Sequence, residues 1–314
     1  MLPVQSKVGV EGLAVCLRYG PARTLFASDA TGDSRCATTI GGGISPTGNR
    51  KPTANMALYD QWCETTVQEN GLKRYLTIVE KAGGRDAVAE NLSATVRGHY
   101  DSLERISDDV NELGYEGAAA ILKELLPTSA RARSGDLGEI LASELTAERL
   151  EFEVPVRRMR FKDGREVPMR GDDFIGVNYA ADEGGLWLLK GEAKSRRNLA
   201  AGVVTEARNA LKRNDGRCTP SSLLFVANRL LEGDEEQADL GRRIRNEVGR
   251  NALAKNRIDH ALFTLSGNGP IGALKTDLAA AEAGRGHAVI NLHVEDYTDF
   301  IDAVFEAAGD IGNG

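Results

Sequence analysis

The stretch LWLLKGEAKS, residues 186–195, places charged side chains at the end of an apolar strand pattern. Side chains at alternate positions of a strand point to the same face, so Glu192 and Lys194 are expected to project together. The sequence contains no other Glu-x-Lys or Asp-x-Lys triplet. Because charges at the end of a buried strand are costly unless they are paired or bind a metal, this stretch predicts a functional cluster.

Further acids precede this strand. The motif RGDDFIGV begins a second apolar strand, and an acid at the entry to that strand can approach Glu192 across the strand spacing of about 5 Å. Asp172 and Asp173 point to opposite faces, so only one can join the cluster, and we favour Asp173 because it directly begins the apolar run. Upstream, the helical segment GDLGEILASEL offers Glu139 and Glu144.

Several carboxylates that converge with a lysine suit a hard divalent cation such as Mg²⁺ or Mn²⁺. Such a cation lowers the pKa of a bound water and polarises a phosphodiester oxygen, and the lysine orients the water or stabilises charge on the phosphate. A Glu-x-Lys pair by itself is usually a surface ion pair. The order of helix acid, Asp-led strand, Glu-x-Lys strand and helix is more restrictive, and it favours metal-dependent hydrolysis of a nucleic-acid backbone.

This order of residues resembles the PD-(D/E)xK nuclease superfamily. The segments RSGDLGEILASEL, VPMRGDDFIGV and LLKGEAKSR also resemble the HamA family, the nuclease subunits of the Hachiman anti-phage defence system. The resemblance implies an α/β fold, a restriction-endonuclease-like mixed sheet flanked by helices. It also implies a DNA endonuclease that binds Mg²⁺ (or Mn²⁺) and works with a separate helicase subunit, HamB. The implied catalytic residues are Glu139, Asp173, Glu192 and Lys194, of which the three acids would bind the metal. No proline precedes Asp173, which departs slightly from the superfamily pattern.

The choice of helix acid stays open on the residues alone. The expected apolar face of the helix consists of Leu137, Ile140, Leu141 and Leu145. Glu144 falls within that face and Glu139 lies nearly opposite, so helical phase favours Glu144 whereas the motif favours Glu139.

Composition and charge indicate a globular protein with a local basic region. The 314 residues include 41% hydrophobic and 27% charged residues, and the formal net charge of −7 excludes a uniformly basic surface. Residues 157–217 nevertheless contain 14 basic and 9 acidic residues. Candidate phosphate contacts that are independent of base sequence are Arg157, Arg158, Arg160, Arg170, Arg196, Arg197, Lys212 and Arg213.

Cysteine spacing and hydropathy indicate in which cellular compartment the protein is expected to work. The four cysteines are far apart and form no CxxC pair, which argues against structural zinc and favours reduced thiols. No apolar run reaches the roughly 18 residues that a membrane span needs, and the first residues lack a signal-peptide pattern. We expect a cytoplasmic protein without a membrane partner.

We expect a boundary near Pro127, between an N-terminal α+β region (1–130) that docks a partner and a nuclease domain (131–314). The first region should contain strands within 8–28, a glycine-rich loop ending near Pro52, and helices at 55–81 and 86–126. Expected strands of the second are 151–161, 173–178, 186–193, 221–227, 258–265 and 287–294. Its expected helices are 134–149, 198–213, 235–249, 272–284 and 296–308.

One motif supports a different function. The loop GNGPIG, from Gly267 to Gly272, follows an expected strand, precedes an expected helix and has the G-x-G-x-x-G spacing of dinucleotide-binding loops. A nucleotide-binding regulatory domain is therefore one alternative, although a tight strand-to-helix connection explains the loop more simply. A catalytically inert nucleic-acid-binding module is the other.

Overall fold

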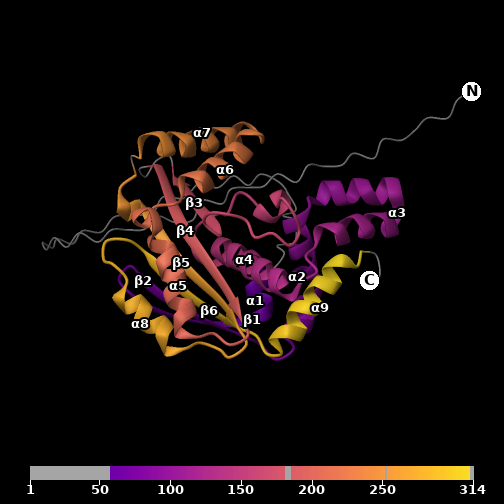
Figure 1. Cartoon of the computed structure of the whole chain (residues 1–314), viewed down its shortest axis with the longest axis horizontal. Helices are drawn as coiled ribbons and strands as arrows, with labels where there is room; N and C mark the ends of the chain where they lie inside the picture. The colour runs from indigo at the N-terminus through magenta and orange to yellow at the C-terminus, as the bar shows by residue number, and fades with distance from the viewer. Residues whose placement is uncertain (1–56, 181–184, 252, 312–314) are drawn as a thin grey trace, which may run out of the picture.

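The computed structural model describes residues 57–180, 185–251 and 253–311, which form a mixed sheet with helices on both faces (Figure 1). The sheet has six strands in the order β1-β2-β6-β5-β4-β3. The strands are β1 (Cys63–Asn70), β2 (Lys73–Glu80), β3 (Phe174–Ala180), β4 (Gly185–Arg196), β5 (Ile258–Ser266) and β6 (His287–His293). The four inner strands run parallel, and β1 and β3 pair antiparallel at the two edges. The predicted α/β class with a mixed, helix-flanked sheet is confirmed.

The helices form a layer on each face of the sheet (Figure 1). One layer contains α1 (Leu58–Trp62), α2 (Gly84–Tyr100), α4 (Ala130–Arg149) and α9 (Tyr297–Gly309). The other contains α5 (Ala201–Lys212), α6 (Pro220–Leu231), α7 (Glu235–Arg250) and α8 (Gly272–Ala280). Helix α3 (Leu103–Leu125) projects from the first layer and bends back at Gly114, where φ is 74°. Short 3-10 turns are η1 (Arg158–Phe161), η3 (Arg213–Gly216) and η4 (Lys255–Arg257).

The largest apolar cluster joins residues from both sides of the expected boundary at 130. Trp62 is fully buried and stacks on Phe300 with ring centroids 5.5 Å apart. Strand β2 pairs in parallel with β6, so β1 and β2 continue the sheet that carries β3 and β4. The division into two domains stays a prediction. Residues 131–314 alone would lack two strands of this sheet.

Three expected elements are wrong, each where an apolar pattern was ambiguous. Instead of one helix over 55–81, the described part holds only α1 and then the hairpin β1–β2, which turns at Gly71 with φ of 59°. Instead of a strand at 151–161, there is a single bridge between Glu153 and Val177, followed by η1.

The expected strand at 221–227 is the helix α6. Its buried residues recur every three or four positions: Ser222, Leu223, Val226, Ala227 and Leu230. Pro220 occupies the first turn, where its missing N–H costs nothing. A short apolar run satisfies helix and strand patterns equally, so periodicity over 221–227 could not decide between them.

The remaining elements follow the expectations with shifted ends. Strands β3, β4, β5 and β6 and helices α5, α7 and α9 occupy the expected segments. The helix expected over 86–126 is divided into α2 and α3; α4 begins at Ala130 with Ser129 as its cap instead of Ser134, and α8 ends at Ala280. The strands expected within 8–28 and the loop ending near Pro52 lie outside the described residues. Among the helices described, none is long and apolar enough to cross a membrane.

Candidate active site

The paired strands β3 and β4 position Asp173 beside Glu192. Phe174 pairs with Gly191, and the Phe174 ring fills the space above it, since a Cβ on Gly191 would lie 2.2 Å from that ring. One residue before this pair, the Asp173 Oδ2 atom accepts a hydrogen bond of 2.8 Å from the Ala193 N–H. The carboxylate thus takes the place of a main-chain acceptor where the ladder ends.

Glu192 and Lys194 project together from β4, as their spacing predicts. Lys194 Nζ donates to Glu192 Oε1 at 2.7 Å and lies 3.3 Å from Glu206 Oε1 on α5. Burial favours the neutral amine, but the hydrogen bond to Glu192 and the surrounding negative charges outweigh it and raise the pKa of Lys194. Lys194 is therefore an ammonium at neutral pH. No spacing in the sequence indicated that Glu206 would join this group.

Helix α4 brings Glu139 to the same end of the strands. Gly138 allows the close approach of α4 to β4, because a Cβ there would lie 3.1 Å from Ser195 Cβ. The Glu139 Oε2 atom is buried and accepts no hydrogen bond from any residue of the described ranges, and Arg158 Nη1 lies 3.7 Å from it. Burial and the negative charge of Asp173 raise the pKa of Glu139 well above its ordinary value.

The pKa values of the three acids are all raised, and the negative charge of Asp173 contributes to the shifts of the other two. Burial and the charge of Asp173 together raise the pKa of Glu192 to about 7, against the opposing hydrogen bond from Lys194. Burial also raises the pKa of Asp173 itself, although the Ala193 N–H opposes this shift. Because the charge of Asp173 acts on both Glu139 and Glu192, added positive charge here would stabilise all three carboxylates.

The two alternative acids have other partners. Glu144 accepts a hydrogen bond of 2.7 Å from His99 and lies 3.6 Å from Arg157. Asp172 lies 3.6 Å from Lys190 and accepts hydrogen bonds from the Thr219 N–H at 2.6 Å and its hydroxyl at 2.9 Å. The structure thus brings Glu139, Asp173, Glu192 and Lys194 together and places Glu144 and Asp172 in separate pairs.

The donor chemistry of this cluster fits a hard cation. Mg²⁺ prefers oxygen ligands, and the cluster offers three carboxylates, including the unpartnered Glu139 Oε2. Within the described ranges, however, no three Asp, Glu, His or Cys side chains are already gathered closely enough to hold a metal ion. The acids are suitable ligands by type, and their side chains would have to converge to share one ion.

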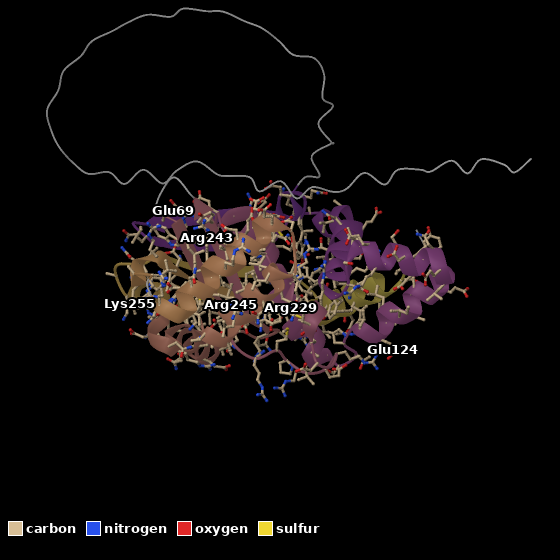
Figure 2. All side chains as sticks on the ribbon, turned by 90° about the horizontal axis from the view of Figure 1, so that it is seen from above. Glu69, Glu124, Arg229, Arg243, Arg245 and Lys255 are labelled. Carbon is tan, nitrogen blue, oxygen red and sulfur yellow. The ribbon has the colours of Figure 1, made fainter. Side chains whose placement is uncertain are left out.

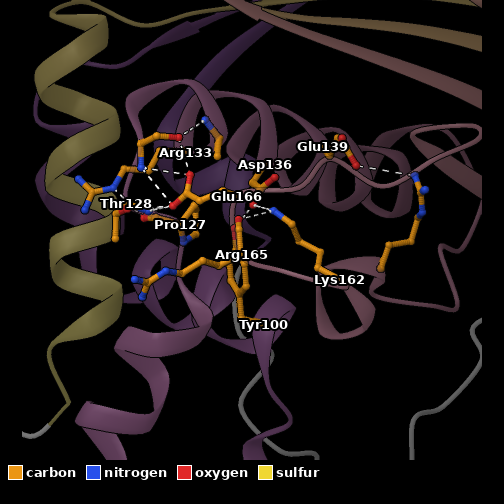
Figure 3. Close-up of polar contacts among 12 residues, drawn as sticks. Tyr100, Pro127, Thr128, Arg133, Asp136, Glu139, Lys162, Arg165 and Glu166 are labelled. Atoms are coloured by element: carbon orange, nitrogen blue, oxygen red, sulfur yellow. Dashed lines mark hydrogen bonds and ion pairs between the residues drawn. The ribbon is translucent and has the colours of Figure 1, made fainter.

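A polar network holds the first half of α4, from its cap at Ser129 to Asp136, which lies about one turn before Glu139 (Figure 3). Asp136 accepts hydrogen bonds from the Tyr100 hydroxyl at 2.5 Å and from Lys162 Nζ at 2.6 Å. Glu166 accepts hydrogen bonds from the main-chain N–H and hydroxyl groups of Thr128 and Ser129, at the helix cap. Residues 162–166 are therefore tied to α4, and Arg158 precedes them on the side of Glu139.

The eight basic candidates divide by burial. Arg158 is buried, while Arg157 and Arg160 are half-buried and donate to the Gly98 carbonyl. Exposed members of the set are Arg170, Arg196, Arg197, Lys212 and Arg213. Figure 2 also shows Arg229, Arg243 and Arg245 on the α6–α7 pair, where Arg243 is paired with Asp239.

The glycine-rich loop from Gly267 to Gly272 connects β5 to α8 and is engaged in internal contacts. Asn268 accepts from the Leu199 N–H and donates to the Leu199 carbonyl, and the Gly267 N–H donates to the Arg197 carbonyl. A Cβ at Gly267 would lie 2.9 Å from Tyr297 Cβ. These contacts agree with a tight connection that packs on the segment after β4.

Comparison with known proteins adds an independent finding. The model of the HamA family matches residues 56–308. The Hachiman protein HamA of Bacillus cereus is 24% identical over 246 residues, which cover 77% of this chain and 86% of that protein. The matched region contains all of the site described above.

Proposed function

The chain belongs to the HamA family, and from that membership we propose that it is a metal-dependent nuclease of a Hachiman anti-phage defence system. The observation that carries the proposal is the group of one buried and two half-buried carboxylates beside a charged lysine, at the point where β3 begins to pair with β4. The pKa values of all three acids are raised, so their ionised forms destabilise the fold, and such destabilisation is typical of a functional site. The order of these elements also supports a restriction-endonuclease-like classification of the sheet.

Glu139, Asp173 and Glu192 would hold Mg²⁺ or Mn²⁺. When bound, the ion would supply a more acidic water and polarise the scissile phosphodiester. Asp173 is held in place by the Ala193 N–H, whereas Glu139 has an oxygen free to turn toward a ligand. The chain therefore offers one fixed and one adjustable carboxylate on two different elements.

Lys194 would act through its positive charge. Its raised pKa keeps the ammonium protonated, so it suits stabilisation of negative charge on the phosphate better than removal of a proton from water. In this structure, contacts with Glu192 and Glu206 hold the Lys194 ammonium between two carboxylates. A phosphate that enters the site would compete with these carboxylates for Nζ.

Exposed arginines would contact the DNA backbone without reading its sequence. Arg196 is the last residue of β4 and Arg197 directly follows it, and Arg213 is close enough to lower the pKa of Glu192. The chain shows no base-reading motif, so we propose cleavage that is independent of base sequence.

A plasmid assay with the full chain tests the nuclease proposal. We expect degradation with Mg²⁺ or Mn²⁺, none with EDTA, and weaker cutting with Ca²⁺, whose larger and more variable coordination suits binding better than catalysis. Glu139→Gln should abolish cutting. Glu144→Gln, on the same helix but paired with His99, should retain it. Undiminished cutting in EDTA, or an inactive Glu144→Gln beside an active Glu139→Gln, would contradict the proposal.

We also propose that the first 130 residues bind the helicase subunit HamB and that this contact restrains the nuclease. The bend of α3 presents Leu113 and Tyr115, which are 54% and 58% exposed. Exposed apolar side chains on a projecting element are suited to a protein contact. Full-length protein with Leu113→Ser and Tyr115→Ser should co-purify less HamB and cause more DNA damage in cells. Unchanged co-purification would reject α3 as the contact.

A further inference from the structure

Arg158 lies between the two chain segments that carry Glu139 and Asp173. Its side chain is only 9% exposed. Nη1 donates to the carbonyls of Asp172 and Asp173, the latter at 2.5 Å, and Nη2 donates to the carbonyl of Arg170 at 2.9 Å. A single guanidinium thus binds three main-chain oxygens in the turn that leads into β3.

Among the residues that the structure describes, no carboxylate accepts a hydrogen bond from Arg158, so its positive charge has no direct ionic partner there. A buried cation requires compensation, and neutral carbonyls supply only part of it. The nearest carboxylate oxygen is Glu139 Oε2 at 3.7 Å, and this oxygen accepts no hydrogen bond. Arg158 therefore balances the charge of Glu139 and leaves the oxygen free for another ligand.

The turn that Arg158 binds is also held from the opposite side. Gly171 has φ of 100°, and a Cβ there would lie 2.1 Å from Ser222 Oγ on α6. The Asp172 N–H donates to that same Ser222 Oγ at 2.9 Å. Arg158 and Ser222 thus clamp the turn between them, and the position of the Asp173 carboxylate depends on both.

We propose that Arg158 is a positioning residue that fixes the turn carrying Asp173, keeps the Glu139 carboxylate next to it, and thereby sets the affinity of the site for a divalent cation. The proposal rests on the proposed function, because it assigns Arg158 to the same metal site. This role requires the planar guanidinium of arginine, because the ammonium of a lysine cannot bind the carbonyls of Arg170, Asp172 and Asp173 with the same geometry. Charge alone would therefore be insufficient.

The test compares Arg158→Lys and Arg158→Gln with the full-length parent. Mn²⁺ binding, followed by electron paramagnetic resonance, should weaken by about ten-fold or more in both variants, the usual effect of removing a group that orients a metal ligand. Excess Mg²⁺ should restore much of the cleavage rate in Arg158→Lys, because the defect lies in metal affinity. The matched control is Arg217→Lys. Arg217 also donates to a main-chain carbonyl, that of Leu253, and lies 3.7 Å from a glutamate. The Arg217→Lys protein should bind Mn²⁺ with the affinity of the parent.

A second variant acts on the other side of the turn and does not remove a buried charge. Ser222→Ala should weaken Mn²⁺ binding by about three-fold, in the same direction as Arg158→Lys but less. Normal Mn²⁺ affinity in folded Arg158→Lys, or in Ser222→Ala if the arginine variants do not fold, would overturn the proposal. Absence of Mn²⁺ binding by the parent protein would instead refute the proposed function.

Discussion

Two adjacent aspartates should respond oppositely to the same isosteric change. Asp172→Asn removes the carboxylate that balances Lys190, whose side chain is 2% exposed, and weakens the acceptor for two groups of Thr219. Removing one partner from a buried ion pair costs about 3 kcal/mol or more. For a chain of 314 residues that corresponds to a fall in Tm of about 5 °C or more.

Asp173→Asn should leave stability intact and remove function. The pKa of Asp173 is raised, so its ionised form is less stable in the folded protein than in the unfolded chain at neutral pH. The neutral amide oxygen still accepts the Ala193 N–H and no longer repels Glu139 and Glu192. We expect an unchanged or higher Tm together with loss of Mn²⁺ binding and of plasmid cleavage.

Thermal denaturation and the plasmid assay, run on both purified variants, distinguish the two roles. The expected pattern is a less stable Asp172→Asn that still cuts below its Tm, and a stable Asp173→Asn that does not cut. If Asp173→Asn melts as low as Asp172→Asn and cuts normally, the assignment of Asp173 to the metal site is wrong.

Three further predictions concern catalysis, pH and packing. Lys194→Ala should lose at least about 100-fold in cleavage rate while retaining Mn²⁺ binding, because it removes charge stabilisation but no ligand; an equally active variant would reject its role. Burial lowers the pKa of His260 to about 3 and that of His287 to about 4, so only the unfolded chain takes up protons at these positions between about pH 6.5 and 4. Stability should therefore fall with acidification, by up to about 2 kcal/mol per histidine at about pH 5, and His260→Gln should show a smaller fall in Tm than the parent between about pH 7 and 5. Gly191→Ala should prevent Phe174 from packing and lower the Tm by several degrees, which a melt indistinguishable from the parent's would disprove.

The local sequence pattern was sufficient to predict segments whose hydrophobic periodicity extends over many residues or whose charged residues have a characteristic spacing. The apolar run before Glu192 predicted β4, and alternation along a strand placed Glu192 and Lys194 on one face. It was insufficient for short apolar segments such as 221–227. The hairpin β1–β2 had a usable signal in Asn70-Gly71, a dipeptide typical of tight turns, which the mixed spacing of apolar residues around it obscured.

The sequence by itself determined the composition of the candidate site: an acid on a helix, an acid before one strand, and Glu-x-Lys on the next. Only the tertiary structure decided between neighbours of identical chemistry. Glu139 and Glu144 differ in their partners because α4 lies against β4 on one side and presents Glu144 to His99 on another. Asp172 and Asp173 differ because Lys190 and Thr219 lie beside the first, whereas the Ala193 N–H meets the second. Such choices depend on contacts between residues distant in the chain, and so does the burial of Arg158, which the sequence shows only as one arginine among many.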